Sequence, residues 1–320
     1  QLATKKKNGV LWCSPDTAAA RGRVRQSICR MAASLLMLVW AFPARAAAAT
    51  SQLPVERLGW KNLVSAGSLV LWTGGVGLTL SGVPSLARSV IQACLRSTLQ
   101  LYIIGGYILT RFFAMHKPWM VVAWISSIGI LAAQEASKRV EYTYDRLQQH
   151  LVLAFLMGGC SVLGASLFLQ ILGPQTPWYT PRTWIPLAGM IYGDSLTATS
   201  LAATTITKQL VTDRQNIELQ LSQGATWREA LSTNLQSVYH IALTPLINSL
   251  SVAGVVHIPG AMTGQILAGQ APFQAAAYQL AIFFLIASTA VSTVQILTRL
   301  AVFHLVDSTN DRLCTDKLRA

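Results

Sequence analysis

Charged residues are scarce in this chain. Asp, Glu, Lys and Arg make up 12% of its 320 residues, whereas 52% are hydrophobic, and soluble domains carry about 25% charged residues. Residues 62–87, 151–180 and 236–298 contain no Lys, Arg, Asp or Glu at all. Runs of about 18 or more apolar residues can cross a bilayer, and in lipid they must be helices or closed barrels. These runs lack the period-two alternation of barrel strands. The predicted fold class is therefore all-α, a polytopic membrane protein.

Several motifs of soluble enzymes are missing. The chain has no Gly-Lys pair, so it has no P-loop for ATP, and it contains neither H-E-x-x-H nor G-x-S-x-G. Residues 221–224, Leu-Ser-Gln-Gly, are not an ATPase signature. We therefore expect no enzyme activity and no cofactor bound by this chain. The five cysteines lie far apart, without metal-site or disulfide spacing, and the five histidines are scattered. We interpret the histidines as loop or packing residues.

The first 50 residues have the features of a targeting segment. They carry eight Lys/Arg and one Asp, which give a net charge of +7 (8 − 1), and the whole chain has a net charge of +13. A short apolar stretch at 31–42 is followed by small residues at 44–49, the order seen in signal peptides with an A-x-A-like cleavage site. The longer basic lead suggests a two-part organelle address, and the alternative is a short extra membrane helix. We predict a cleaved segment at 1–50, a transmembrane domain at 51–305 and a cytoplasmic tail at 306–320.

Seven membrane spans are predicted from the apolar runs. They cover residues 63–83, 86–113, 118–133, 151–172, 183–206, 236–258 and 273–300. The second carries Arg88, Gln92, Arg96 and Gln100 at every fourth position, which places them on one face of a helix. Lys and Arg collect in the loops at one side, which the positive-inside rule makes cytoplasmic, or stromal in a plastid. The expected location is a plastid membrane (thylakoid or inner envelope) or a bacterial plasma membrane.

The polar stretch at 207–234 is predicted to hold two short helices on the cytoplasmic side. The first stops near Gly224, and the second begins after Thr226, with Glu229 at the position that a capping box needs. A helix–Gly-Ala–helix between two spans is how many ABC permeases dock on their ATPase. Glu218, Gly224 and Ala225 have the spacing of that signature, whereas its downstream Ile-x-Leu-Pro is not at the usual distance. The alternative is an ordinary amphipathic connector.

Two further segments are candidates for a substrate path. Asp194 lies inside the fifth span, where a carboxylate costs about 2.5–3.5 kcal/mol on insertion scales and usually faces the bundle interior or water. Its alternative role is structural pairing with Arg88 or Arg96. Residues 258–269 combine Pro with several Gly in an apolar stretch, which suggests broken or re-entrant backbone or, alternatively, a tight outer loop. The spacings Gly189-x-x-x-Gly193 and Gly260-x-x-x-Gly264 permit close packing of helices.

Four blocks in register give the chain a family resemblance. They are Arg96-x-x-x-Gln100-x-x-x-x-Gly105, the run at 185–193, the run at 218–230, and the run at 258–269 followed by Tyr278-Gln279. Together they resemble the FetB-type permease family, which includes bacterial iron exporters and plant aluminium-sensitivity permeases. The resemblance covers residues 85–300.

The resemblance implies a seven-span permease, paired as a dimer, with a separate P-loop ATPase subunit that binds ATP and Mg²⁺. It implies export of metal ions or, in the plant branch, of a nucleotide sugar. Asp194 replaces an Asn common in the family, and Asn248 and Ser251 stand where some members carry Asp and Lys, which puts the cargo in doubt. The predicted docking loop is Glu218, Gly224, Ala225 and Thr226. The predicted substrate path is Arg96, Gln100, Asp194, Asn248, Pro259, Gly260, Met262, Thr263, Gly264 and Gln265.

Two other functions stay open at the level of sequence. The first is a secondary transporter or channel that works without an ATPase, with Asp194 coupling transport to protons. The second is a scaffold or assembly protein of an organelle membrane that transports nothing. No nucleic-acid partner is expected, because the basic charge belongs to loops and to the targeting segment.

Overall fold

The computed structural model describes residues 66–80, 82, 84–105, 117–173, 177–307, 312–313 and 318–319. The predicted targeting segment at 1–50 lies outside the described residues. The chain divides into two compact units, residues 1–96 and 97–320.

The described part of the first unit is a helical hairpin. Its first arm begins at residue 66, continues as a π-helical stretch, η3 (Leu71–Gly77), and ends as α3 (Leu78–Leu80). After a turn with Gly82 at φ +80°, α4 (Pro84–Ile103) begins. A Cβ on Gly74 would lie 3.1 Å from Cγ1 of Val90. Glycine therefore lets the two arms approach closely.

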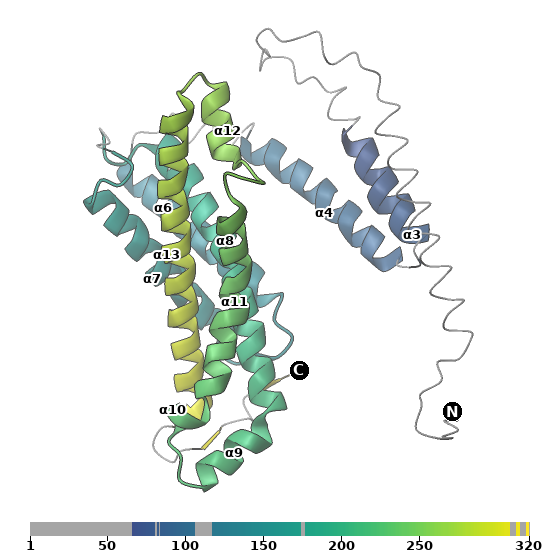
Figure 1. Cartoon of the computed structure of the whole chain (residues 1–320), viewed down its shortest axis with the longest axis vertical. Helices are drawn as coiled ribbons and strands as arrows, with labels where there is room; N and C mark the ends of the chain where they lie inside the picture. Colours follow the sequence, from purple (N-terminus) through teal and green to yellow (C-terminus); the bar gives the residue numbers. More distant parts are fainter. Residues whose placement is uncertain are drawn as a thin grey trace. The chain divides into compact units, whose positions relative to one another are not determined.

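The second unit is a bundle of five long helices. They are α6 (Pro118–Ser137), α7 (Leu147–Phe168), α8 (Pro181–Thr212), α11 (Ser232–Val252) and α13 (Pro272–Leu305). Consecutive long helices run in opposite directions (Figure 1). α13 packs against α7 and α8, and α8 also contacts α6 and α11. The short helices α9 (Arg214–Ser222) and α10 (Trp227–Ala230) lie at one end, and α12 (Gly260–Leu267) lies at the other (Figure 1).

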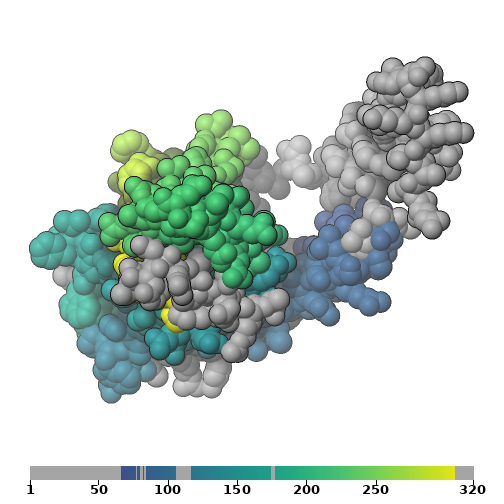
Figure 2. All heavy atoms as spheres, turned by 90° about the horizontal axis from the view of Figure 1, so that it is seen from below, coloured from purple at the N-terminus to yellow at the C-terminus, as the bar shows by residue number. Residues whose placement is uncertain are grey.

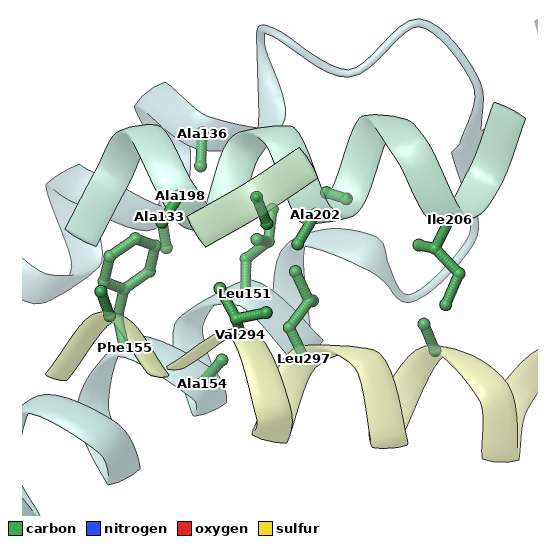
Figure 3. Close-up of a cluster of buried hydrophobic side chains, with 14 of the residues drawn as sticks. Ala133, Ala136, Leu151, Ala154, Phe155, Ala198, Ala202, Ile206, Val294 and Leu297 are labelled. Carbon is green, nitrogen blue, oxygen red and sulfur yellow. The ribbon is translucent and has the colours of Figure 1, made fainter. Parts of the chain in front are cut away.

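Small residues and a few large ones share the centre of this bundle. Figure 3 shows Leu151 and Phe155 of α7 among alanines of α6 and α8. Where α7 passes α8, Gly159 leaves no room for a Cβ beside the ring of Tyr192, which is fully buried. Deeper in the core, Thr199 Oγ1 of α8 donates a hydrogen bond of 3.0 Å to Thr293 Oγ1 of α13. Close packing and interhelical hydrogen bonds are what hold helices together in lipid.

Short strand pairs fold the C-terminal residues back on the bundle. β1 (Thr143–Tyr144) pairs with β4 (Leu318–Arg319), and β2 (Val306–Asp307) pairs with β3 (Arg312–Leu313), both antiparallel. The predicted tail at 306–320 thus returns to the loop between α6 and α7 at residues 318–319.

Among the described residues, three helices are long and apolar enough to cross a membrane: α6, α7 and α13. The segment at 66–80, α4, α8 and α11 lie on the other four predicted spans, but they are shorter or more polar. α8 is rich in Ser and Thr, and α4 carries Arg88 and Arg96. The helical class is confirmed, whereas the count of seven spans stays a prediction.

Within the five-helix bundle, two of the predicted span ends differ most from the ends of the observed helices. The sixth span ends at Val252 rather than at residue 258, because Gly254 turns the chain at φ +84° and its N–H bonds to the carbonyl of His257 at 2.9 Å. The fifth helix continues to Thr212, past the predicted end at 206. Thr207 and Leu210 are buried in the bundle, so packing extends this helix into the polar sequence.

Candidate functional site

The connector between α8 and α11, residues 213–231, is built by local backbone rules. α9 ends in a left-handed Gly224 at φ +91°, with the N–H of Gly224 bonded to the carbonyl of Leu221 and that of Ala225 to Gln220, both at 3.1 Å. This is a Schellman motif. α10 then begins with the predicted capping box, in which Glu229 Oε2 accepts from the Thr226 N–H at 2.9 Å and the Thr226 hydroxyl at 2.8 Å.

The first residue of the connector is hydrogen-bonded to α11, and a second bond beside it joins α8 directly to α11. Asn234 Nδ2 of α11 donates to Asp213 Oδ2 at 2.7 Å, and Gln209 Nε2 of α8 donates to Ser237 Oγ at 2.8 Å. Within the connector, the side chains of Ile217, Ala230 and Leu231 are buried. A displacement of the connector would therefore be transmitted to α8 and α11, because its inner side is part of the packed core.

The outer side of the connector brings the four predicted docking residues together. Glu218, Gly224 and Thr226 are exposed, and Ala225 is half-buried. Arg214 Nε lies 2.7 Å from Glu218 Oε1, and the apolar Leu219 beside this pair is 55% exposed. Figure 2 views the molecule from this end, with the green connector in front. Charged residues around an exposed Leu form a surface suited to a protein partner.

Basic residues collect at the connector's end of the bundle. Those on described helices and loops there are Lys138, Arg139, Arg146, Lys208, Arg214, Arg228 and Arg299. At the opposite end, the described part of the second unit has Lys117 and Arg182. The described helices thus keep the charge asymmetry from which the positive-inside rule predicts a cytoplasmic or stromal connector.

Hydrogen bonds at the capping box change the ionisation of its carboxylate. The backbone N–H and the hydroxyl of Thr226 lower the pKa of Glu229, since both bonds favour the charged form. Near the same end, burial raises the pKa of the Tyr144 hydroxyl. Glu229 is therefore ionised, and Tyr144 protonated, over the physiological pH range.

Two predicted path residues, Asp194 on α8 and Asn248 on α11, lie at similar depth. The bonds Gln209–Ser237 and Asp213–Asn234 fix the register of these antiparallel helices. Because the helices are antiparallel and rise equally per residue, Asp194 is level with residue 252 of α11 and Asn248 with residue 198 of α8, so the two differ in depth by about one helical turn. Both side chains are exposed on the bundle surface. Of the two predicted surroundings of Asp194, the bundle interior and water, this exposed position favours the second. An exposed carboxylate in a membrane helix requires water or another protein surface beside it.

The remaining path residues belong to other helices. Pro259, Gly260, Met262, Thr263, Gly264 and Gln265 belong to α12 or immediately precede it. Pro259 is buried, and the buried Oε1 of Gln265 has no hydrogen-bond partner among the described residues. The segment is a short outer helix, not an unbroken extension of α11. Arg96 and Gln100 are exposed on α4, which begins in the first unit and ends in the second.

Sequence reasoning missed two clusters near the connector. Trp227, Tyr239, Arg299 and Phe303 line a cleft beside α10. Arg299 could have been noticed, since it ends the charge-free run of α13. A second cluster joins the buried Tyr144 and His150, whose hydroxyl and Nδ1 lie 3.0 Å apart, with the ring of His304. The interpretation of His150 as a packing residue is confirmed.

No group of three or more His, Cys, Asp or Glu side chains that could hold a metal ion is found in the described part of the chain. Cys160 Sγ lies 3.8 Å from the hydroxyl of Tyr192, and no disulfide involves Cys94 or Cys160 in the described part of the chain.

Comparison with known proteins identifies the family. The uncharacterised protein family UPF0014 matches residues 60–306. The chain belongs to the UPF0014 family. UPF0014 membrane protein slr1647 of Synechocystis is 32% identical over 235 residues, covering 73% of this chain and 82% of that protein. Protein ALUMINUM SENSITIVE 3 of Arabidopsis thaliana is 29% identical over 220 residues, or 68% of this chain and 77% of the relative.

A third UPF0014 relative carries a functional name. The probable iron export permease protein FetB of Escherichia coli is 30% identical over 206 residues, which cover 64% of this chain and 77% of FetB. The resemblance drawn from the sequence is thereby confirmed. No solved structure matches the chain. Family membership and the apolar helices make this chain an integral membrane protein.

Proposed function

We propose that this chain is the membrane-spanning permease subunit of an ABC-type transporter, driven by a separate P-loop ATPase. The observation that carries the proposal is the α8–α11 connector. Its outer side is exposed, its inner side is buried against the bundle and hydrogen-bonded to α11 through Asp213, and it lies at the basic end of the bundle. An ATPase that moved the connector would move these two helices, which carry Asp194 and Asn248. ATP and Mg²⁺ bind to the partner, and this chain is not an enzyme.

The proposed cargo is a metal ion, iron-like, or a small anionic solute, exported through a homodimer of this chain. FetB is named as a probable iron export permease, which supports iron as the cargo. The predicted path residues Arg96, Gln100, Asp194, Asn248 and those at 259–265 remain the candidates for contact with cargo. A proton-coupled carrier is the second candidate function, favoured by the exposed carboxylate of Asp194 in the middle of α8.

Affinity purification from native membranes tests the docking role with a matched pair of variants. Gly224→Arg is the test and Gly269→Arg the control, because both glycines have φ +91° and open surroundings but lie at opposite ends. We expect an ATPase with a P-loop to copurify with the wild type and with Gly269→Arg, and to be lost from Gly224→Arg. Equal recovery with both variants would disprove docking at the connector. Transport by the purified chain without an ATPase would favour the carrier.

A further inference from the structure

A cleft of about 490 Å³ opens at the connector's end of the bundle. Three elements line it: Trp227 and Arg228 come from α10, Leu235 and Tyr239 from α11, and the segment Thr298–Phe303 of α13 supplies the remaining wall. Arg299 is the first charged residue after the apolar run of α13. The cleft therefore lies where the membrane-spanning part of α13 meets the aqueous side.

Part of the cleft lining is positively charged. Arg228 and Arg299 both line it, no carboxylate does, and neither arginine pairs with an acid among the residues that the structure describes. Thr298, also on this lining, is 1% exposed, and its Oγ1 has no described hydrogen-bond partner. Two guanidinium groups and an unused hydroxyl match the charge and the acceptor oxygens of a phosphate group.

The rest of the lining is apolar and aromatic. Leu235 and Val302 line it, and the ring of Trp227 lies 6.1 Å from that of Phe303, whose side chain is 64% exposed. Arg228 Cζ is 5.1 Å from the centroid of the Trp227 ring. A free phosphate ion would gain nothing from this apolar lining. A phosphate that carries acyl chains would contact both the basic and the apolar residues of the lining. Basic and aromatic residues at a membrane interface bind lipid in the same way.

We propose that this cleft binds an anionic phospholipid, with its phosphodiester between Arg228 and Arg299 and the start of an acyl chain along Val302 and Phe303. The proposal does not rest on the permease function. A lipid bound there would hold α10 against α11 and α13, and so would stabilise the folded connector.

The test measures thermal unfolding of the purified full chain in phosphatidylcholine micelles, with phosphatidylglycerol added stepwise and no ATPase present. Phosphatidylglycerol should raise the unfolding temperature. Because bonds to charged groups are strong, Arg228→Gln and Arg299→Gln should each weaken this effect about tenfold in lipid concentration. Thr298→Val should weaken it roughly threefold. Arg182→Gln, an exposed arginine at the opposite end, is the control and should behave as the wild type.

Unfolding in phosphatidylcholine alone reports whether each variant folds, and Arg299→Lys, which keeps the charge, should retain most of the effect. Three results would overturn the proposal. These are no advantage of phosphatidylglycerol over phosphatidylcholine, equal losses in Arg182→Gln and the cleft variants, or the same protection from inorganic phosphate at equal concentration. If phosphatidylglycerol gave no advantage, the cleft would instead be a candidate contact surface for the partner ATPase.

Discussion

Glycine has two separate uses at the residue scale. In α7, Gly158 and Gly159 allow close contact with neighbouring helices. A Cβ on Gly158 would lie 2.7 Å from Cγ2 of Thr293, and one on Gly159 would overlap the ring of Tyr192. In the connector, Gly224 instead supplies a left-handed backbone at φ +91°. The first use depends on tertiary neighbours and the second on the local chain alone.

Gly159→Ala should destabilise the bundle by about 1–3 kcal/mol, because the added methyl group has no space beside the buried Tyr192 ring. Gly164→Ala is a matched control on the same helix, since nothing lies within 4 Å of the added Cβ. Thermal unfolding in detergent should show a lower midpoint for the first variant and an unchanged one for the second. Equal midpoints would contradict the packing of α7 on α8.

At the element scale, the connector is a rigid unit rather than a flexible loop. A Schellman motif ends α9, a capping box begins α10, and Asp213 before α9 accepts a hydrogen bond from Asn234 of α11. Because the backbone groups at these helix ends are bonded locally, the fold of the connector does not require a partner. An ATPase would therefore meet a preformed surface.

Thr226→Ala and Glu229→Gln should each loosen α10, because each removes half of the capping box. Hydrogen–deuterium exchange should show faster exchange at residues 227–230 in both variants. Glu218→Gln is the control, since its carboxylate pairs with Arg214 on α9 and contributes nothing to the box. Unchanged exchange in all three would contradict a stabilising role for the box.

Acidification should act on α10 as Glu229→Gln does. The pKa of Glu229 is lower in the folded chain than its ordinary value. The box therefore contributes its full stability at pH above that ordinary value, and it loses this contribution as the pH falls through the lowered pKa. In the wild type, exchange at α10 corrected for the intrinsic rate should rise in this acidic range. Glu229→Gln should show no such rise.

The molecule contains strongly apolar helices and helices that carry exposed polar residues. α6, α7 and α13 are apolar enough to span a membrane, whereas α4, α8 and α11 expose polar residues such as Arg96, Asp194 and Asn248. Polar groups at membrane depth require protein or water beside them. The polar helices are therefore where a second copy or a transport path is expected.

At the scale of the whole molecule, we predict that the two ends of the bundle face opposite sides of the membrane. In a cysteine-free background, Ser222→Cys in the connector should react with an impermeant maleimide only from the cytoplasmic or stromal side. Gln270→Cys, just after α12, should react only from the other side. Both positions are exposed and lie at opposite ends of the bundle. Labelling of both from one side would contradict the antiparallel order of the helices across the membrane.

The sequence by itself determined the helical membrane class, the family and the local geometry of the connector. Scarce charge over long runs requires helices in lipid, and Gly224 and the pair Thr226–Glu229 act through neighbours a few residues away. Tertiary structure decided the true ends of α8 and α11, the outward position of Asp194, and the meeting of Arg228 with Arg299 in one cleft. These depend on contacts between helices distant in sequence, which no local pattern contains.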